Sequence, residues 1–363
     1  MSKVFSAEKH RLTGLDGIRL WAILLIVAEH TGFIKENGAV GVALCFVLSG
    51  FLTVFSQKEE EPSLYFFKPK NWLFYYLRRA FRILPLYYFC ILFFWFFYPA
   101  ICFGSWESVI RHMFFLECGI HFWYLQQEVF MYLLVPPIML VLAFLNKVFR
   151  GRRTEWLYIL LLLAAAWYCK IHPLFYLQGN GQMQPFRIYL FLMGMATAYI
   201  CRWIQSREWN ISGKLTILLY IVGNVWIVLA FLITLLSSPM FLIYFGIDLR
   251  NTYYSVGMDI PFGIVAMLWI IAAVFCKKGP VAVFFGNPLF VHLSERSYGI
   301  YLFHFLLRIS LGVPDGIMMF LLDTFMSICV AEVLYLLIEK PLGDFGKHLS
   351  VRKLGKYYKT ILV

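Results

Sequence analysis

The chain has 363 residues, of which 61% are hydrophobic and only 14% are charged, and its mean hydropathy is +0.73. Soluble domains are about 45–50% apolar and about 25% charged, so this composition excludes a soluble protein and indicates a chain that lies mostly in lipid. The formal net charge of +12 does not indicate nucleic-acid binding, because cytoplasmic loops of membrane proteins collect Lys and Arg. The eight cysteines include no CxxC pair, so we expect neither a zinc site nor a disulfide framework.

Ten apolar segments are candidates to cross the bilayer, which takes roughly 20 apolar residues. We therefore predict an all-α, polytopic membrane bundle of about ten transmembrane helices. The predicted helices are residues 14–33, 40–56, 83–103, 123–145, 156–171, 185–204, 215–236, 256–276, 297–312 and 316–338. The apolar segment 239–247 is too short to span and is predicted to be re-entrant or interfacial.

Basic residues gather in every second loop, which predicts the orientation of the chain. They cluster within residues 58–82, 147–153, 202–214, 277–278 and 340–359. Cytoplasmic loops carry such an excess, so we predict a multi-pass protein of the plasma membrane with both termini in the cytoplasm. We expect residues 1–341 to form one transmembrane domain and residues 342–363 to form a short basic cytoplasmic tail, with no soluble catalytic domain after it.

Two ionisable residues of the first predicted helix share one face. Arg19 and His30 are eleven residues apart, which brings them within roughly 20° of the same face and about 16 Å apart along the axis. An arginine near the cytoplasmic side and a histidine beyond the midplane suit a donor with a charged tail in the cytosol and a reacting end in the membrane. The alternative is that Arg19 snorkels to lipid phosphate and His30 caps the helix near the outer interface.

The fourth predicted helix carries a carboxylate at a depth comparable to that of His30. Glu128 lies about 7 Å below Trp123, which stands at the outer end of that helix. A carboxylate there can orient an imidazole or raise its basicity. A structural salt bridge is the alternative.

The ninth predicted helix has a polar stripe. Ser297, Tyr301 and His304 fall on one face, and Arg308 extends that face outward. In so apolar a helix, such a stripe should point into the bundle. It serves either chemistry or interhelical hydrogen bonds.

Arginines also cluster in the segment Leu77–Pro85, where Arg78 and Arg82 share a helical face and Arg79 lies between them. The guanidinium fork matches phosphate oxygens, such as those of coenzyme A. Positive-inside topology predicts the same cluster, so the cluster is compatible with a phosphate site without requiring one.

Taken together, these segments resemble the membrane-bound acyltransferase-3 family over nearly the whole chain. The first helix is similar to that family's pattern of Arg or Lys, ten residues and then His, which falls here on Arg19 and His30. The six matching pieces, in the family's order, are Leu15–His30, Gly41–Leu52, Leu77–Pro85, Trp123–Pro136, Ser297–His304 and Glu339–Pro341. The chain departs from the family's pattern at Cys45, where Phe is common, and at Val129 and Phe130, where Glu and Gln often stand.

The resemblance implies an enzyme, a membrane O-acyltransferase that moves an acyl group, usually acetyl, from cytosolic acyl-CoA to a hydroxyl on the other side of the membrane. The implied partners are acetyl-CoA or another acyl-CoA, an envelope polysaccharide or lipid-linked acceptor, and membrane lipids, with no metal and no nucleic acid. We expect catalytic roles for His30, Glu128 and His304. We expect donor contacts from Arg19, Arg78, Arg79 and Arg82. We expect acceptor contacts from Tyr301, Arg187 and Asp259.

Two other classes of protein compete with this interpretation. A transporter or flippase also uses intramembrane His, Glu and Arg, as a proton relay or substrate path. The absence of a visible inverted repeat argues mildly against a transporter. A scaffolding membrane protein is disfavoured, because buried polar stripes are costly without a function.

Overall fold

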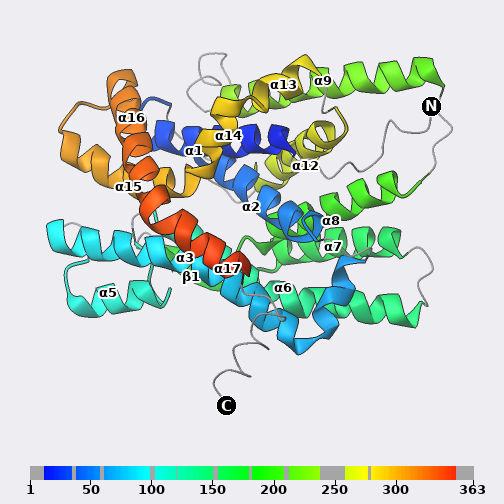
Figure 1. Ribbon diagram of the computed structural model, residues 1–363, viewed down its shortest axis with the longest axis horizontal. Coiled ribbons are helices and arrows are strands. Elements are labelled where there is room, and N and C mark those ends of the chain that lie inside the picture. The colour runs from blue at the N-terminus through cyan, green and yellow to red at the C-terminus, as the bar shows by residue number, and fades with distance from the viewer. Residues whose placement is uncertain are drawn as a thin grey trace. The chain divides into compact units, whose positions relative to one another are not determined.

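The computed structural model describes residues 12–34, 38–57, 61–98, 103–119, 121–149, 154–179, 182–207, 212–237, 258–276 and 279–348. Nearly all of these residues are helical (Figure 1). The two strands among them, β1 (Tyr176–Gly179) and β2 (Gln182–Pro185), pair as an antiparallel hairpin. The chain divides into two compact units, which are described one at a time.

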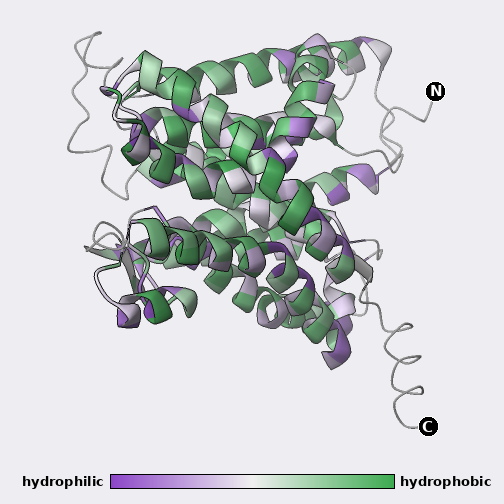
Figure 2. Ribbon diagram, turned by 60° about the vertical axis from the view of Figure 1, so that its left-hand side comes forward, coloured by the Kyte–Doolittle hydropathy of each residue, from purple (hydrophilic) through white to green (hydrophobic). Residues whose placement is uncertain are grey.

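Five described helical stretches are long and apolar enough to cross a membrane. They are α2 (Gly38–Phe55), α3 (Pro69–Phe97), α6 (Trp123–Val148), α9 (Gly213–Leu236) and the continuous stretch Ile317–Gly346. Figure 2 shows that hydrophobic residues dominate these helices. The all-α membrane character is thus confirmed, whereas the number of ten spans and the cytoplasmic side of the termini remain predictions.

Unit 1 comprises Met1–Gln57, Arg153–His172 and Arg187–Ile328. Its helices are α1 (Thr13–His30), α2, α7 (Glu155–Ile171), α8 (Ile188–Gln205), α9, α12 (Asp259–Phe275), α13 (Pro280–Phe285), α14 (Pro288–Glu295), α15 (Ser297–Leu311) and the first part of α16 (Ile317–Leu334). Helix α2 is central, because it packs against α1, α8 and α12. Helix α2 has no charged residue that would need water, so it can pack against other helices on three sides.

Helices α2 and α8 cross at very short range. A Cβ atom added at Gly50 would lie 2.0 Å from the carbonyl oxygen of Phe191, and one added at Gly194 would lie 2.0 Å from that of Val47. Small residues at such crossings let two backbones approach closely, which is how membrane helices gain packing contacts. These two glycines therefore set the spacing at the centre of unit 1.

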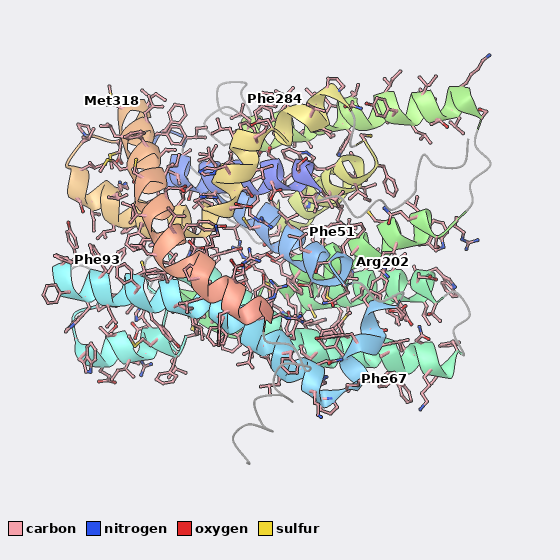
Figure 3. The ribbon with its side chains drawn as sticks, in the orientation of Figure 1. Phe51, Phe67, Phe93, Arg202, Phe284 and Met318 are labelled. Atoms are coloured by element: carbon pink, nitrogen blue, oxygen red, sulfur yellow. The ribbon has the colours of Figure 1, made fainter. Side chains whose placement is uncertain are left out.

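Unit 2 comprises Lys58–Arg152, Pro173–Phe186 and Cys329–Val363. Its elements are the 3₁₀ helix η1 (Pro62–Phe67), α3, α5 (Trp106–Met113), α6, the β1–β2 hairpin, the end of α16, the π-turn η3 (Tyr335–Glu339) and α17 (Lys340–His348). Helix α17 packs on α3, where the Phe345 and Phe81 rings are 5.2 Å apart. Aromatic side chains line α3 towards its C-terminal end, with Phe93 and Phe97 rings 4.5 Å apart (Figure 3).

The predicted starts of two helices were wrong, and the third helix also ends at Phe97 rather than at residue 103. The third helix begins at Pro69 rather than at residue 83, because a proline suits the first turn and the arginine-rich segment that follows is a good helix former. Hydropathy registers only the apolar half of such a helix. The sixth begins at Ile188 rather than at 185, since residues up to Pro185 belong to the hairpin. The predicted re-entrant segment 239–247 lies outside the described residues.

The close α2–α8 crossing predicts an asymmetric response to added methyl groups. Gly194→Ala should lower the thermal unfolding temperature of the detergent-solubilised protein, because the new methyl group overlaps backbone atoms of α2 and such overpacking costs about 1–3 kcal/mol. Gly213→Ala is the matched control, since a Cβ there meets nothing within 4 Å. Equal melting temperatures for the two variants would contradict the close approach of the α2 and α8 backbones at Gly194.

Candidate active site

A pair of histidines joins the end of α1 to the middle of α15 within unit 1. The Nδ1 atom of His30 lies 2.8 Å from the Nε2 atom of His304, and the two rings stack with centroids 5.0 Å apart. His304 is fully buried, whereas His30 is partly exposed. Of the two, His30 is therefore the ring that a reactant can reach.

The hydrogen bonds of His304 determine which nitrogens carry protons. Its Nδ1 atom lies 2.7 Å from the backbone carbonyl oxygen of Tyr301, and a carbonyl only accepts, so Nδ1 carries a proton. In the neutral ring, Nε2 of His304 is then an acceptor and takes a proton donated by Nδ1 of His30. The remaining nitrogen of His30, Nε2, keeps its lone pair, and it has no hydrogen-bond partner in the described part of the chain.

Arg19 stands near the other end of α1 and already has partners. Its Nη1 atom lies 3.5 Å from Oδ1 of Asp16 and 3.4 Å from Oγ of Ser294, and the Ser294 hydroxyl donates to the same carboxylate at 3.2 Å. Ser294 lies on α14 and His304 on α15, the next helix along the chain. Arg19 and His30 therefore both face the α14–α15 segment.

Arg187 and Asp259, both predicted to meet the acceptor, are brought together by the fold. Arg187 precedes α8 and Asp259 opens α12, and their Nε and Oδ2 atoms are 3.7 Å apart. The hydroxyl of Tyr189 donates to the same carboxylate. Lys170 at the end of α7 lies over the Tyr189 ring, 4.8 Å from its centroid. No local pattern pointed to Tyr189 or Lys170, because the cluster joins three separate helices.

Glu128 belongs to unit 2, where it accepts a hydrogen bond of 2.9 Å from the hydroxyl of Tyr132. The guanidinium of Arg79 lies 4.3 Å from the centroid of the Tyr132 ring and 5.6 Å from that of Tyr75, and its charge acts on Glu128. Arg79 thus stacks between aromatic rings beside a carboxylate. The predicted pairing of Glu128 with His30 joins residues of different units and stays a prediction.

The other two arginines of the cluster differ from Arg79. Arg78 donates from Nη2 to the hydroxyl of Tyr65 at 3.1 Å, a neutral partner that leaves its charge unbalanced. Arg82 is exposed. Arg78 and Arg79 are both half-buried, so the structure separates the predicted three-arginine cluster into one exposed residue, one bonded to a phenol and one stacked on two tyrosine rings.

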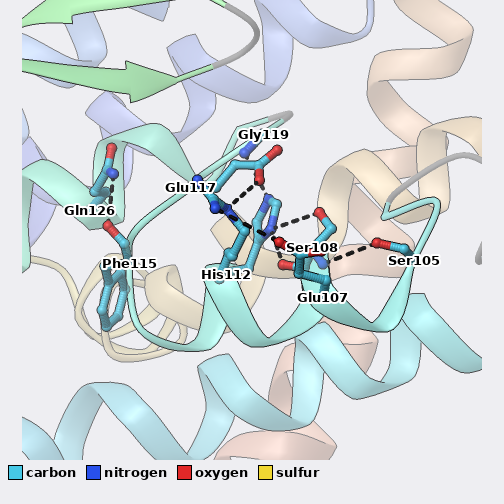
Figure 4. A network of polar contacts seen from close by, with 9 residues as sticks. Ser105, Glu107, Ser108, His112, Phe115, Glu117, Gly119 and Gln126 are labelled. Carbon is cyan, nitrogen blue, oxygen red and sulfur yellow. Dashed lines mark hydrogen bonds and ion pairs between the residues drawn. The ribbon is translucent and has the colours of Figure 1, made fainter.

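His112 on α5, in unit 2, is a histidine that the sequence analysis did not single out (Figure 4). Its Nδ1 atom lies 2.7 Å from the carbonyl oxygen of Ser108 and so carries the proton, while Nε2 accepts the backbone N–H of Gly119 at 2.9 Å. Both ring nitrogens are used, and burial lowers the pKa of His112 below its ordinary value of 6.5. This histidine fixes the loop after α5 and offers no free nitrogen for chemistry.

Unit 1 also contains an apolar cavity. Helices α8, α9 and α12 of unit 1 line a cavity of about 580 Å³ whose walls are almost entirely apolar, with Trp203, Tyr220 and Trp226 among them. It holds none of the predicted catalytic residues. Within the described ranges, no three His, Cys, Asp or Glu side chains gather as a metal site.

Comparison with known proteins gives a consistent result. Residues 12–336 match the family model of an acyltransferase domain, acyltransferase 3. The O-acetyltransferase OatA of Staphylococcus aureus (strain NCTC 8325 / PS 47) is 25% identical over 390 residues, which cover 97% of this chain and 61% of the relative. A putative O-acetyltransferase of S. aureus (strain COL) is 24% identical over 377 residues, which cover 92% of this chain and 58% of the relative. The chain thus spans less than two thirds of the length of either relative. No solved structure matches significantly.

The His112 contacts predict a pH-dependent loop. The folded pKa lies below the value of the open chain, so the open state binds more protons as the pH falls through about 6.5, and the stability present above that pH is lost below it. Hydrogen exchange of the Gly119 amide, corrected for intrinsic rates, should therefore accelerate between about pH 7.5 and pH 5. In His112→Gln, which cannot gain a proton, the corrected rate should not depend on pH; the same acceleration in that variant would rule His112 out.

Proposed function

The chain belongs to the membrane-bound acyltransferase-3 family, and on this premise we propose that it is an O-acetyltransferase of the plasma membrane. It takes the acetyl group from cytosolic acetyl-CoA and transfers it to a hydroxyl of an extracytoplasmic acceptor, in the first instance an envelope polysaccharide. The observation that carries this proposal is the His30–His304 hydrogen bond, which leaves one imidazole nitrogen with a lone pair at a partly exposed position.

The geometry suits general base catalysis by His30. The acceptor hydroxyl gives its proton to Nε2 of His30 while its oxygen attacks the acetyl carbonyl carbon, and the same proton then goes to the departing coenzyme A sulfur. The hydrogen bond from Nδ1 to the buried His304 holds the ring in the tautomer that this step needs. His304 takes the orienting role that the sequence suggested for Glu128, and it acts through His30.

Two arginines of α3 suit the phosphates of coenzyme A. Arg82 is exposed, and Arg78 is half-buried and donates to the neutral phenol of Tyr65, so we assign the contacts with the phosphate anions to these two side chains. Arg79 fits that role less well, because it stacks on two tyrosines beside Glu128. Arg19 remains our candidate for guiding the pantetheine arm, although its pairing with Asp16 must loosen for it to do so.

We assign the acceptor contacts to Arg187 and Asp259. A sugar hydroxyl can donate to the carboxylate and accept from the guanidinium, so it can join the existing pair without breaking it. Tyr301 contributes through its backbone carbonyl, which holds His304, and its own side chain is buried.

Acetyl transfer should depend on His30 far more than on a histidine elsewhere. In sealed liposomes with radiolabelled acetyl-CoA on the donor face and a cell-envelope extract as acceptor, His30→Ala should lower the transfer rate by about 10²–10⁴-fold, the usual contribution of a general base. His304→Asn should cost less, since it removes only the orienting bond.

His172→Ala is the matched control, because His172 is exposed after the end of α7. Full transfer by His30→Ala would disprove the role of His30. If the wild-type protein neither cleaves acetyl-CoA nor labels any fraction of the extract, the transporter is favoured.

The arginines of α3 should separate into two classes. Arg78→Gln and Arg82→Gln should each raise the KM for acetyl-CoA about tenfold or more with little change in kcat, because a hydrogen bond to a charged group contributes about 1.5–3 kcal/mol. Arg79→Gln should instead lower the unfolding temperature, since Glu128 loses its neighbouring cation. Arg111→Gln, on α5, is the control. An unchanged KM in both Arg78→Gln and Arg82→Gln would place the donor elsewhere.

A further inference from the structure

Arg308 lies one helical turn beyond His304 on α15, on the same face. Its Nη2 atom donates to both carboxylate oxygens of Asp315, at 2.9 and 3.1 Å. The Arg308 side chain is 29% exposed and that of Asp315 is 57% exposed. The ion pair is therefore open on one side, and its other side faces the bundle.

The turn that follows His30 fixes this ion pair in place. Gly32 has φ +67°, and a Cβ added there would lie 2.8 Å from Cβ of Asp315. The N–H of Gly316 donates to the carbonyl oxygen of Thr31 at 2.9 Å. Asp315 thus packs directly on the residues that end α1, and it holds the Arg308 guanidinium at the same end of α1 as His30.

Arg308 keeps donors to spare. Asp315 occupies Nη2, while Nε is buried and makes no hydrogen bond within the described part of the chain. A buried donor without a partner calls for an explanation, and a catalytic role is one such explanation. The charge of Arg308 acts on two groups, His30 and the fully buried Asp323, whose Oδ2 atom also lacks a hydrogen bond among the described residues.

Arg19 is less well placed than Arg308 for chemistry at His30. Arg19 lies about 16 Å away along the axis of α1 and is held by Asp16 and Ser294. We propose that Arg308 is a further catalytic residue, whose guanidinium stabilises the negative charge that forms on the acyl carbonyl oxygen beside His30. This inference rests on the proposed acyl transfer.

The proposed acyl transfer passes through an oxyanion intermediate. The acceptor oxygen bonds to the acyl carbon as its proton passes to Nε2 of His30, and the carbonyl electron pair moves onto oxygen to give an oxyanion that accepts hydrogen bonds from Arg308. The carbonyl then re-forms, the carbon–sulfur bond breaks, and the coenzyme A thiolate takes the proton from His30. A preorganised cation aimed at such an oxyanion lowers the barrier without reorganising during the step.

The test compares Arg308→Gln, Arg308→Lys and Asp315→Asn in the liposome assay, with Arg111→Gln as control and with melting temperatures measured in parallel. Arg308→Gln should lower kcat by about 10²–10³-fold, the usual loss for one oxyanion donor, and leave the KM for acetyl-CoA within a few-fold of wild type. Arg308→Lys should recover part of kcat, because it keeps the charge. Asp315→Asn should cost only a few-fold, because Arg308 remains. Added guanidinium ion should partly restore Arg308→Gly.

Three outcomes would overturn the inference. One is an unchanged kcat in Arg308→Gln. Another is an equal loss of kcat in Arg308→Gln and Asp315→Asn together with equal drops in melting temperature. That result would mean that Arg308 only stabilises the turn before α16. The third is the absence of any transfer by the wild-type protein, which would disprove the proposed function itself. If the wild-type protein is active, His30→Ala is inactive and Arg308→Gln is as active as wild type, only the role of Arg308 is disproved.

Discussion

Lipid tails offer no hydrogen bonds, so a polar side chain inside a membrane bundle must find its partner within the protein or on a ligand. This constraint orders the interior of unit 1. Thr53 and Thr197 bond the backbone of their own helices, at 2.9 and 2.8 Å, and the indole N–H of Trp21 donates to Thr234 at 2.9 Å. Each of these contacts satisfies a donor that lipid would leave without a hydrogen bond.

Against that background, spare hydrogen-bonding capacity distinguishes functional groups from structural ones. His112 uses both ring nitrogens on the backbone of one loop. His30 uses one nitrogen on His304 and keeps the other. The two histidines therefore differ in what they can do, and the difference lies in their hydrogen bonds rather than in their residue type.

The same distinction applies to the arginines. Arg79 stacks on two tyrosine rings near a carboxylate, so it serves the packing of unit 2, whereas the Arg187–Asp259 pair can still be joined by an acceptor hydroxyl. Arg82 is exposed and Arg78 has a phenol partner. Arg78 and Arg82 belong to unit 2, and Arg19 and His30 belong to unit 1.

The sequence by itself determined the membrane class, the family and most helix positions. Hydropathy and the helical period are local properties, which is why the predicted starts at 123 and 297 coincide with Trp123 of α6 and Ser297 of α15. Hydropathy failed to predict the start of α3, because charged residues form the first part of this helix, before its apolar part.

Only the tertiary structure decided which polar groups meet. The predicted pairing of His30 with Glu128 stays a prediction, and the fold of unit 1 joins His30 to His304, 274 residues along the chain. Arg308 was seen only as the end of a polar stripe, and its position beside the end of α1 depends on the turn that holds Asp315 against Gly32. Helical periodicity assigns a side chain to a face of its own helix, but the partner on that face depends on how distant helices pack, and no short stretch of sequence contains that information.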